Sequence, residues 1–324
     1  MEKKENNVLS LNSSYQKAIE QISKPLVVIS GPGSGKRDLI VKKISYLINE
    51  KGILDDRILA ISSLSNSSRD ISYGVEAEAN RPFCAKTFSQ LLNGIIEDYQ
   101  KYIPYIDKNY SIIERNEEML FFFENLENFN LSSIEIKNNI SQLAFEFQYI
   151  ISKLKEFGIS LSDFENLLKK PQLREDLPFL NSVENNLSSM MDLFIVYSKY
   201  ELYKRENNFM DFGDLHLYVK ELLENNTKIR EEVSNRYEYI FLDGFEDFSK
   251  IEFEIVSLIS KKNNITIVGD KKQSIYELRG VGFENLSFFQ KIYPNCEMIY
   301  LSENYCFSKE VLSVLNSLIK DFAS

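Results

Sequence analysis

The sequence predicts an α/β fold, in which a domain with a parallel sheet is interrupted by a long all-helical segment. Short apolar runs of strand length occur in both end regions of the chain, and each is followed by glycine, serine or acidic residues, as in buried parallel strands. Between about residues 91 and 203 glycine nearly disappears, and apolar residues recur at helical spacing. A chain of 324 residues also exceeds one average domain, so we expect more than one.

A glycine-rich loop, Ser30–Arg37, follows the first strand-like run and precedes a helix-like run. Strand, glycine loop, lysine and helix form the order of a phosphate-binding loop, where backbone N–H groups and a helix N-terminus surround an anion. Magnesium binding in such loops uses a Ser or Thr hydroxyl directly after the lysine, and this position holds Arg37. The loop therefore predicts a nucleotide site and puts its Mg²⁺ in question. The residues expected to hold the cofactor are Gly31, Pro32, Gly33, Ser34, Gly35, Lys36 and Arg37.

Further apolar runs predict the rest of the sheet. With the first strand and the helix after the loop, residues 57–62 complete a β-α-β unit, which implies a parallel sheet with a right-handed crossover. A short strand is expected within 82–88, and three more at 239–243, 265–270 and 297–301.

Ligands of parallel sheets collect beyond the carboxyl ends of the strands. Lys36, Asp243 and Gln273 each follow such an end. Lys36 would reach the β- and γ-phosphates, Asp243 would hold Mg²⁺, and Gln273 would sense the γ-phosphate.

Composition limits the function further. The net charge of −10 disfavours broad nonspecific nucleic-acid binding, although it leaves room for a local basic groove. The chain contains no run of eighteen apolar residues and starts with a polar stretch that no signal-peptide region follows, so we expect no membrane partner. Its three cysteines have no metal-binding spacing, and a cytoplasmic protein with reduced thiols is the simplest interpretation.

The order of these motifs resembles the N-terminal region of the UvrD/Rep/PcrA-like superfamily 1 DNA helicases. The resemblance runs from about Leu11 to Ile319, nearly the whole chain. The matching stretches are Leu11-Asn12 with Ala18-Ile19, Gly31–Lys36, Ile58–Ile61, Thr87-Phe88, Asp211–Leu215, Asp243 with Asp247, Val268–Tyr276, Arg279-Gly280 and Asn304-Tyr305.

The resemblance implies a domain organisation and a set of ligands. Residues 1–90 and 204–290 would form a first RecA-like P-loop domain, 91–203 an all-helical inserted subdomain, and 291–324 the start of a truncated second RecA-like domain. ATP lies between two such domains in this family, and Tyr305 is assigned to its site. Single-stranded DNA would contact Thr87, Phe88, Tyr276 and Arg279. A protein partner would supply the missing helicase domains.

Several positions depart from the family pattern. A general base contributes about 10²–10⁴ in rate, and an arginine on the transferred phosphoryl group about 10³–10⁵, so their joint loss predicts little hydrolysis. The departures are Tyr15 for the glutamine that reads adenine, Arg37 for the hydroxyl, Gly244 for the glutamate that activates water, Glu246 for the following glutamine, Leu278 for an aromatic residue and Cys306 for the arginine.

Two of these positions, and two of the expected DNA contacts, keep two interpretations open. Arg37 either pairs with phosphate and replaces part of the metal charge, or is a solvated or salt-bridged residue at a helix start. Glu246 either substitutes as the base or is a surface acid; on an extended backbone it would face the same side as Gly244. Phe88 and Tyr276 either contact DNA or are packed in the interior.

Three functions follow from these observations. The leading hypothesis is a degenerate helicase module, a pseudoenzyme with residual nucleotide or single-stranded DNA binding and little ATP hydrolysis. The second is an active DNA-dependent ATPase completed by a partner, and the third a structural module or truncated remnant. Asp243, Glu246 and Gln273 are catalytic candidates, and none is assigned outright.

Overall fold

The computed structural model describes residues 13–31, 33–104, 106–107, 109–133, 140–169, 187–261, 264–270, 283–305, 307–308 and 310–311. Within them a six-stranded sheet has the order β3-β2-β6-β7-β1-β8, and every neighbouring pair is parallel. The predicted α/β class with a parallel sheet is confirmed, including the strands expected at 57–62, 239–243, 265–270 and 297–301. The strands are β1 (Leu26–Ser30), β2 (Ile58–Ser62), β3 (Lys86–Thr87), β6 (Tyr239–Asp243), β7 (Ile265–Gly269) and β8 (Glu297–Leu301).

Both faces of the sheet are buried, because successive side chains of a strand point to opposite sides. In β1, Val27 and Ile29 join one apolar core, while Leu26 and Val28 join another on the opposite face. This burial on two sides explains why the strands are continuous apolar runs in the sequence rather than alternating ones.

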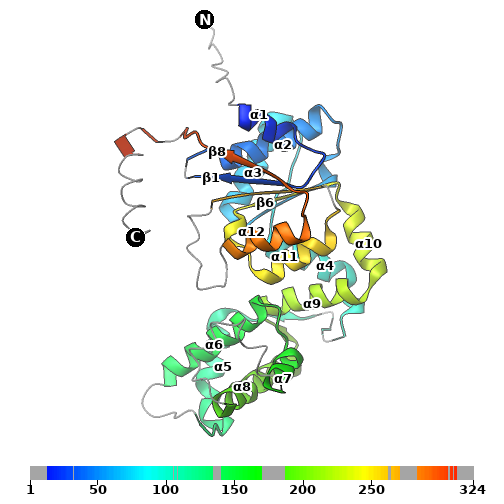
Figure 1. Cartoon of the computed structure of the whole chain (residues 1–324). Helices are drawn as coiled ribbons and strands as arrows, with labels where there is room; N and C mark the ends of the chain where they lie inside the picture. The colour runs from blue at the N-terminus through cyan, green and yellow to red at the C-terminus, as the bar shows by residue number, and fades with distance from the viewer. Residues whose placement is uncertain are drawn as a thin grey trace, which may run out of the picture.

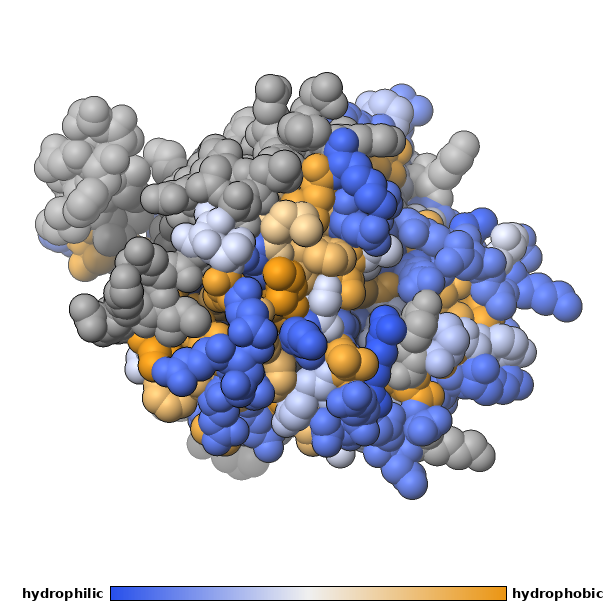
Figure 2. All heavy atoms as spheres, turned by 90° about the horizontal axis from the view of Figure 1, so that it is seen from below, coloured by the Kyte–Doolittle hydropathy of each residue, from blue (hydrophilic) through white to orange (hydrophobic). Residues whose placement is uncertain are grey.

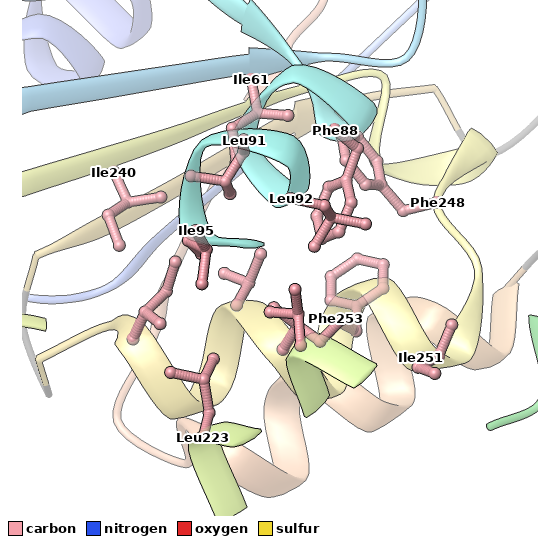
Figure 3. Packing of buried hydrophobic residues seen from close by; sticks show 14 of the residues in the cluster. Ile61, Phe88, Leu91, Leu92, Ile95, Leu223, Ile240, Phe248, Ile251 and Phe253 are labelled. Atoms are coloured by element: carbon pink, nitrogen blue, oxygen red, sulfur yellow. The ribbon is translucent and has the colours of Figure 1, made fainter. Parts of the chain in front are cut away.

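Helices cover the two faces in separate layers (Figure 1). Three early helices pack on one face and five later ones on the other, whose close packing Figure 3 shows around Phe88, Phe248 and Phe253. The first set is α1 (Ser13–Glu20), α2 (Lys36–Asn49) and α3 (Ser65–Ala79), and the second is α4 (Phe88–Tyr99), α9 (Phe212–Asn225), α10 (Thr227–Arg236), α11 (Lys250–Ile259) and α12 (Phe283–Ile292).

A helical segment projects from the sheet domain and has an apolar core of its own, centred on Phe122, Leu154 and Tyr197. Figure 2 views the molecule from this end and shows hydrophobic side chains lying between hydrophilic ones. No helix in the described ranges is long and apolar enough to cross a bilayer. The segment's helices are α5 (Arg115–Asn125), α6 (Ile140–Glu156), α7 (Leu161–Lys169) and α8 (Leu187–Glu206).

One detail of the predicted all-helical segment is wrong. A two-residue strand, β4 (Ser111–Ile112), pairs in parallel with β5 (Phe209–Met210). Two residues are too few to produce a periodic pattern, so the sequence carries no signal for this strand. Helix α4, whose residues from 91 onward fall in the predicted insertion, packs on the sheet through Leu91 and Leu92. The division of the chain at 90/91 and 203/204 stays a prediction.

A buried ionic cluster joins the helical segment to the sheet domain. Lys155 Nζ in α6 lies 2.6 Å from Asp211 Oδ2, 2.6 Å from Asp214 Oδ1 and 2.8 Å from Glu201 Oε1. Lys204 in α8 contacts the same three carboxylates. Asp211 is also the N-cap of α9, because its side chain accepts from the Asp214 N–H. The three neighbouring acids hold the pKa of Lys155 well above its usual value despite its complete burial.

Candidate nucleotide site

The glycine loop forms a cradle between β1 and α2 with the backbone geometry of a phosphate-binding loop. Gly33 and Gly35 have φ values of +71° and +80°, a region that glycine enters at little cost. Gly35 precedes the first residue of α2, and its carbonyl accepts from the Leu39 N–H at 2.9 Å. The first N–H groups of α2 therefore point into the loop, where an anion also meets the positive end of the helix dipole. Inside the loop, Ser34 Oγ donates to the Gly31 carbonyl at 2.7 Å. Pro32 lies outside the described residues.

The ends of neighbouring strands bring further polar groups to this edge. Ser62 and Asp243 are register partners on β2 and β6, and Ser62 Oγ donates to Asp243 Oδ2 at 3.0 Å. Asp243 is 6% exposed, and burial raises the pKa of its carboxyl, with Arg37 as the largest opposing influence. The structure thus brings Lys36 and Asp243 to one edge, as the sequence indicates. Gln273 lies outside the described residues.

Arg37 forms ion pairs with two acids. Its Nη1 lies 3.3 Å from Asp70 Oδ2, and its Nε lies 3.5 Å from Asp243 Oδ2. Its side chain remains 49% exposed. Arg37 is therefore a salt-bridged residue at the helix start, and one of its partners is the carboxylate expected to hold the metal. Its pairing with phosphate stays a prediction.

Glu246 is buried, so its interpretation as a surface acid is wrong. It is 6% exposed, and its Oε1 lies 3.9 Å from Lys36 Nζ. The expectation assumed an extended backbone, but Gly244 has a φ of +77° and turns the chain into a short 3₁₀ helix, Phe245–Asp247. The Glu246 carboxylate packs on Gly269, where any Cβ would collide with it. Burial raises the pKa of Glu246 to about 7, against the opposing charge of Lys36.

Helix α1 places an aromatic side chain against the cradle. The Tyr15 hydroxyl donates to Asp38 Oδ2 at 2.6 Å, and its ring is buried beside Gly35. The ammonium of Lys43 holds this helix in place by donating to the carbonyls of Ala18 at 2.8 Å and Ile19 at 3.1 Å. Burial lowers the pKa of Lys43 to about 7.

The chain after β8 returns to the cradle. The Tyr305 N–H donates to the Gly33 carbonyl at 2.8 Å, and a Cβ on Gly33 would lie 2.6 Å from Asn304 Nδ2. The Tyr305 ring meets the Tyr15 ring edge to face with centroids 6.3 Å apart, and it is 44% exposed. The structure therefore puts Tyr305, assigned to the cofactor site, within reach of a group bound at the loop.

Two of the positions expected to contact DNA, Thr87 and Phe88, lie at the start of α4. Thr87 is the N-cap of α4, where its side chain accepts from the Gln90 N–H. The ring of Phe88 is 5% exposed and stacks on His216 with centroids 5.6 Å apart. Of the two interpretations of Phe88, the packed one is the one observed. Tyr276, Arg279, Leu278 and Cys306 lie outside the described residues.

The residues present do not fit a magnesium ion. Mg²⁺ requires near-octahedral oxygen ligands at about 2.0–2.1 Å. Arg37 supplies a guanidinium, which has no acceptor atom, and places it on the one carboxylate that the metal would use. This site therefore differs chemically from a phosphate loop that carries a hydroxyl after the lysine.

Sequence reasoning missed several members of the site. Ser62 ends a predicted strand and Asp70 lies in a polar stretch, and only the strand order and the packing of α3 on α2 bring them to Asp243 and Arg37. One weak signal is present in the sequence: Ser62 is the last residue of one predicted strand, and Asp243 is the last residue of another. This signal predicts a contact between the two side chains only once β2 and β6 are known to be neighbours.

Fold and loop together define the class of P-loop α/β proteins, in which ligands collect at the carboxyl edge of the sheet. Residues 11–294 match the family described as UvrD/REP helicase N-terminal domain. The chain therefore belongs to the UvrD/REP helicase family.

Three relatives illustrate the similarity. A probable DNA helicase II homolog of Mycoplasma capricolum is 30% identical over 315 residues, which cover 96% of this chain and 41% of the relative. The ATP-dependent DNA helicase Rep of Buchnera aphidicola is 28% identical, over 96% of this chain and 45% of its own length. The ATP-dependent DNA helicase PcrA of Staphylococcus epidermidis is 28% identical, over 97% and 40%. The chain thus spans less than half the length of these relatives.

Proposed function

We propose that this chain is the nucleotide-binding module of a UvrD-like helicase that binds ATP and hydrolyses it poorly. The observation that carries the proposal is Gly244, which stands where the resemblance implies the glutamate that activates water. Its φ of +77° lies in the left-handed region, which costs a residue with a side chain about 1–2 kcal/mol. Position 244 therefore offers no carboxylate, and its backbone conformation disfavours a residue with a side chain.

Binding has separate support. The cradle keeps its two positive-φ glycines, Lys36 and the N-terminus of α2, which together attract an anion without any catalytic group. Tyr305 lies beside Gly35 and offers a ring face for a base. ATP is the proposed ligand, because the Rep and PcrA relatives are named ATP-dependent helicases.

The remaining parts of the proposal concern the larger assembly. The first RecA-like domain, the helical insertion and the start of a second RecA-like domain are assigned to 1–90 with 204–290, 91–203 and 291–324. Single-stranded DNA is proposed as a second ligand, with Thr87 as the described candidate contact. Unwinding needs the second domain, which a protein partner or further chain would contribute.

The test measures binding and turnover on the same preparation. Calorimetry is expected to show ATP binding that Lys36→Ala abolishes, while Lys24→Ala, which removes an exposed lysine elsewhere, leaves it unchanged. Phosphate release with Mg²⁺ and single-stranded DNA is expected to stay near background. Turnover of about 1–100 s⁻¹, the usual range of efficient phosphoryl transfer, would overturn the proposal.

A second function is favoured by Glu246. Its buried carboxyl, with a pKa of about 7 and 3.9 Å from Lys36, has the protonation range of a general base. In this alternative the chain is an active ATPase completed by a partner's second domain. Efficient hydrolysis by the wild-type protein with its partner, lost in Glu246→Gln but kept in the exposed Glu76→Gln, would establish it in place of the first.

A further inference from the structure

The side chain that follows the P-loop lysine engages the carboxylate expected to bind the metal. Arg37 Nε lies 3.5 Å from Asp243 Oδ2, the same oxygen that accepts from Ser62 Oγ. Asp243 is buried, so its charge is little screened by solvent and requires a cation or hydrogen bonds close by. Arg37 provides that cation from within the chain.

This arrangement excludes the usual place of the metal. A divalent ion on Asp243 Oδ2 would meet the guanidinium at close range, and the two positive charges would repel each other. The hydroxyl that would complete its ligand set is missing at position 37. Displacing Arg37 would in turn separate it from both Asp243 and Asp70.

The guanidinium can still serve an incoming phosphate. It carries five N–H donors in a planar fork, and the two observed ion pairs involve Nε and Nη1. The Arg37 side chain is half-exposed. Arg37 lies in the first turn of α2, where the N–H groups of the cradle converge. Arginine pairs with phosphate oxygens through charge-assisted hydrogen bonds. One side chain can therefore bridge the buried carboxylate and a bound phosphate.

We propose that this site binds the nucleoside triphosphate as its metal-free anion, with Arg37 in place of Mg²⁺ as the counter-ion. The inference rests on the proposed nucleotide binding and specifies the form of the ligand. Mg²⁺ then weakens binding, because it neutralises the phosphates that Arg37 and Lys36 would otherwise contact.

Calorimetric titration of the full chain with ATP, in EDTA and in excess Mg²⁺, tests this inference. The wild-type affinity is expected to be at least as high in EDTA. Arg37→Thr removes the counter-ion and restores a hydroxyl, so its affinity in EDTA should fall by about tenfold or more, and added Mg²⁺ should now raise it. Arg69→Thr, which removes the same charge from the exposed face of the neighbouring helix α3, should behave as wild type.

Asp243→Asn gives an independent readout. Where Asp243 holds a metal, this change weakens binding of Mg-ATP; where it holds Arg37, the change releases the guanidinium and preserves or tightens binding in EDTA. Thermal unfolding of each variant confirms that it folds. Wild-type binding that requires Mg²⁺, or an Arg37→Thr variant with unchanged affinity in EDTA, would overturn the inference and leave the proposed function standing. Absence of ATP binding under both conditions would overturn the proposed function itself.

Discussion

At the scale of single residues, two acids at the end of β6 have different partners. Asp243 is paired with Arg37 and Ser62, whereas Glu246 has the more distant Lys36 and packs on the backbone at Gly269. Burial raises the pKa of both carboxyls, and at Glu246 it raises the pKa to about 7. Proton uptake at this side chain links folding to pH.

Glu246→Gln should change the pH dependence of stability. Between the unfolded value of 4.5 and the folded value of about 7, the folded protein binds the extra proton, so this group's contribution to stability falls as pH rises. The shift corresponds to about 3 kcal/mol, and the glutamine variant should exceed wild type by about 1–3 kcal/mol at pH 8. At pH 4, below both pKa values, the difference should nearly vanish. Urea unfolding at both values measures it.

The exposed Glu76→Gln serves as the control for that experiment, and its stability curve should run parallel to that of wild type. Equal stabilities of wild type and Glu246→Gln at pH 8 would show that the buried carboxyl is not destabilised by its surroundings.

At the scale of elements, glycines mark where helices approach one another. Gly213 lies in the first turn of α9, and a Cβ there would lie 2.5 Å from Lys155 Cδ and 2.7 Å from Lys155 Cβ in α6. Gly94 lies inside α4 with nothing within 4 Å of such a Cβ. An alanine substitution at Gly213 therefore tests close packing, whereas the same substitution at Gly94 tests helix propensity alone.

Gly213→Ala should destabilise the protein by about 1–3 kcal/mol, because the added methyl group forces α6 away from α9. Gly94→Ala should instead stabilise it by about 0.5–1 kcal/mol, because alanine loses less backbone entropy in a helix. Chemical denaturation of both variants checks the pair. A Gly213→Ala variant as stable as wild type would contradict the close packing of α6 on α9.

At the scale of the whole molecule, the ionic cluster is a buried polar connection between the helical segment and the sheet domain. Two lysines from α6 and α8 face Glu201, Asp211 and Asp214, and all are nearly inaccessible to solvent. Removing one partner from such a cluster leaves a buried charge uncompensated. The cluster therefore couples the folding of the two parts.

Lys155→Met should lower the free energy of unfolding by about 3–5 kcal/mol. Amide hydrogen exchange should accelerate at the start of α9 and through α6 and α8, since the contacts between the parts are weakened. Lys199→Met, on the exposed face of α8, should stay within about 0.5 kcal/mol of wild type. Unchanged exchange at α9 in Lys155→Met would contradict the coupling.

The sequence by itself determined the α/β class, the phosphate loop and the strands after which Lys36 and Asp243 stand. Local signals carry these features, because strand runs, glycine positions and a helix start depend on nearby residues. The sequence also shows that Arg37 and Gly244 depart from the family pattern, because such departures depend only on which residue stands at each position.

The tertiary structure decided which side chains meet. The pairing of Arg37 with Asp243 and Asp70, and the donation from Ser62 to Asp243, depend on strand order and helix packing between residues far apart in the chain. The burial of Glu246 depends on a left-handed turn at Gly244 and on the room left by Gly269. Desolvation and ion pairing act through space, so no local pattern in the sequence records them.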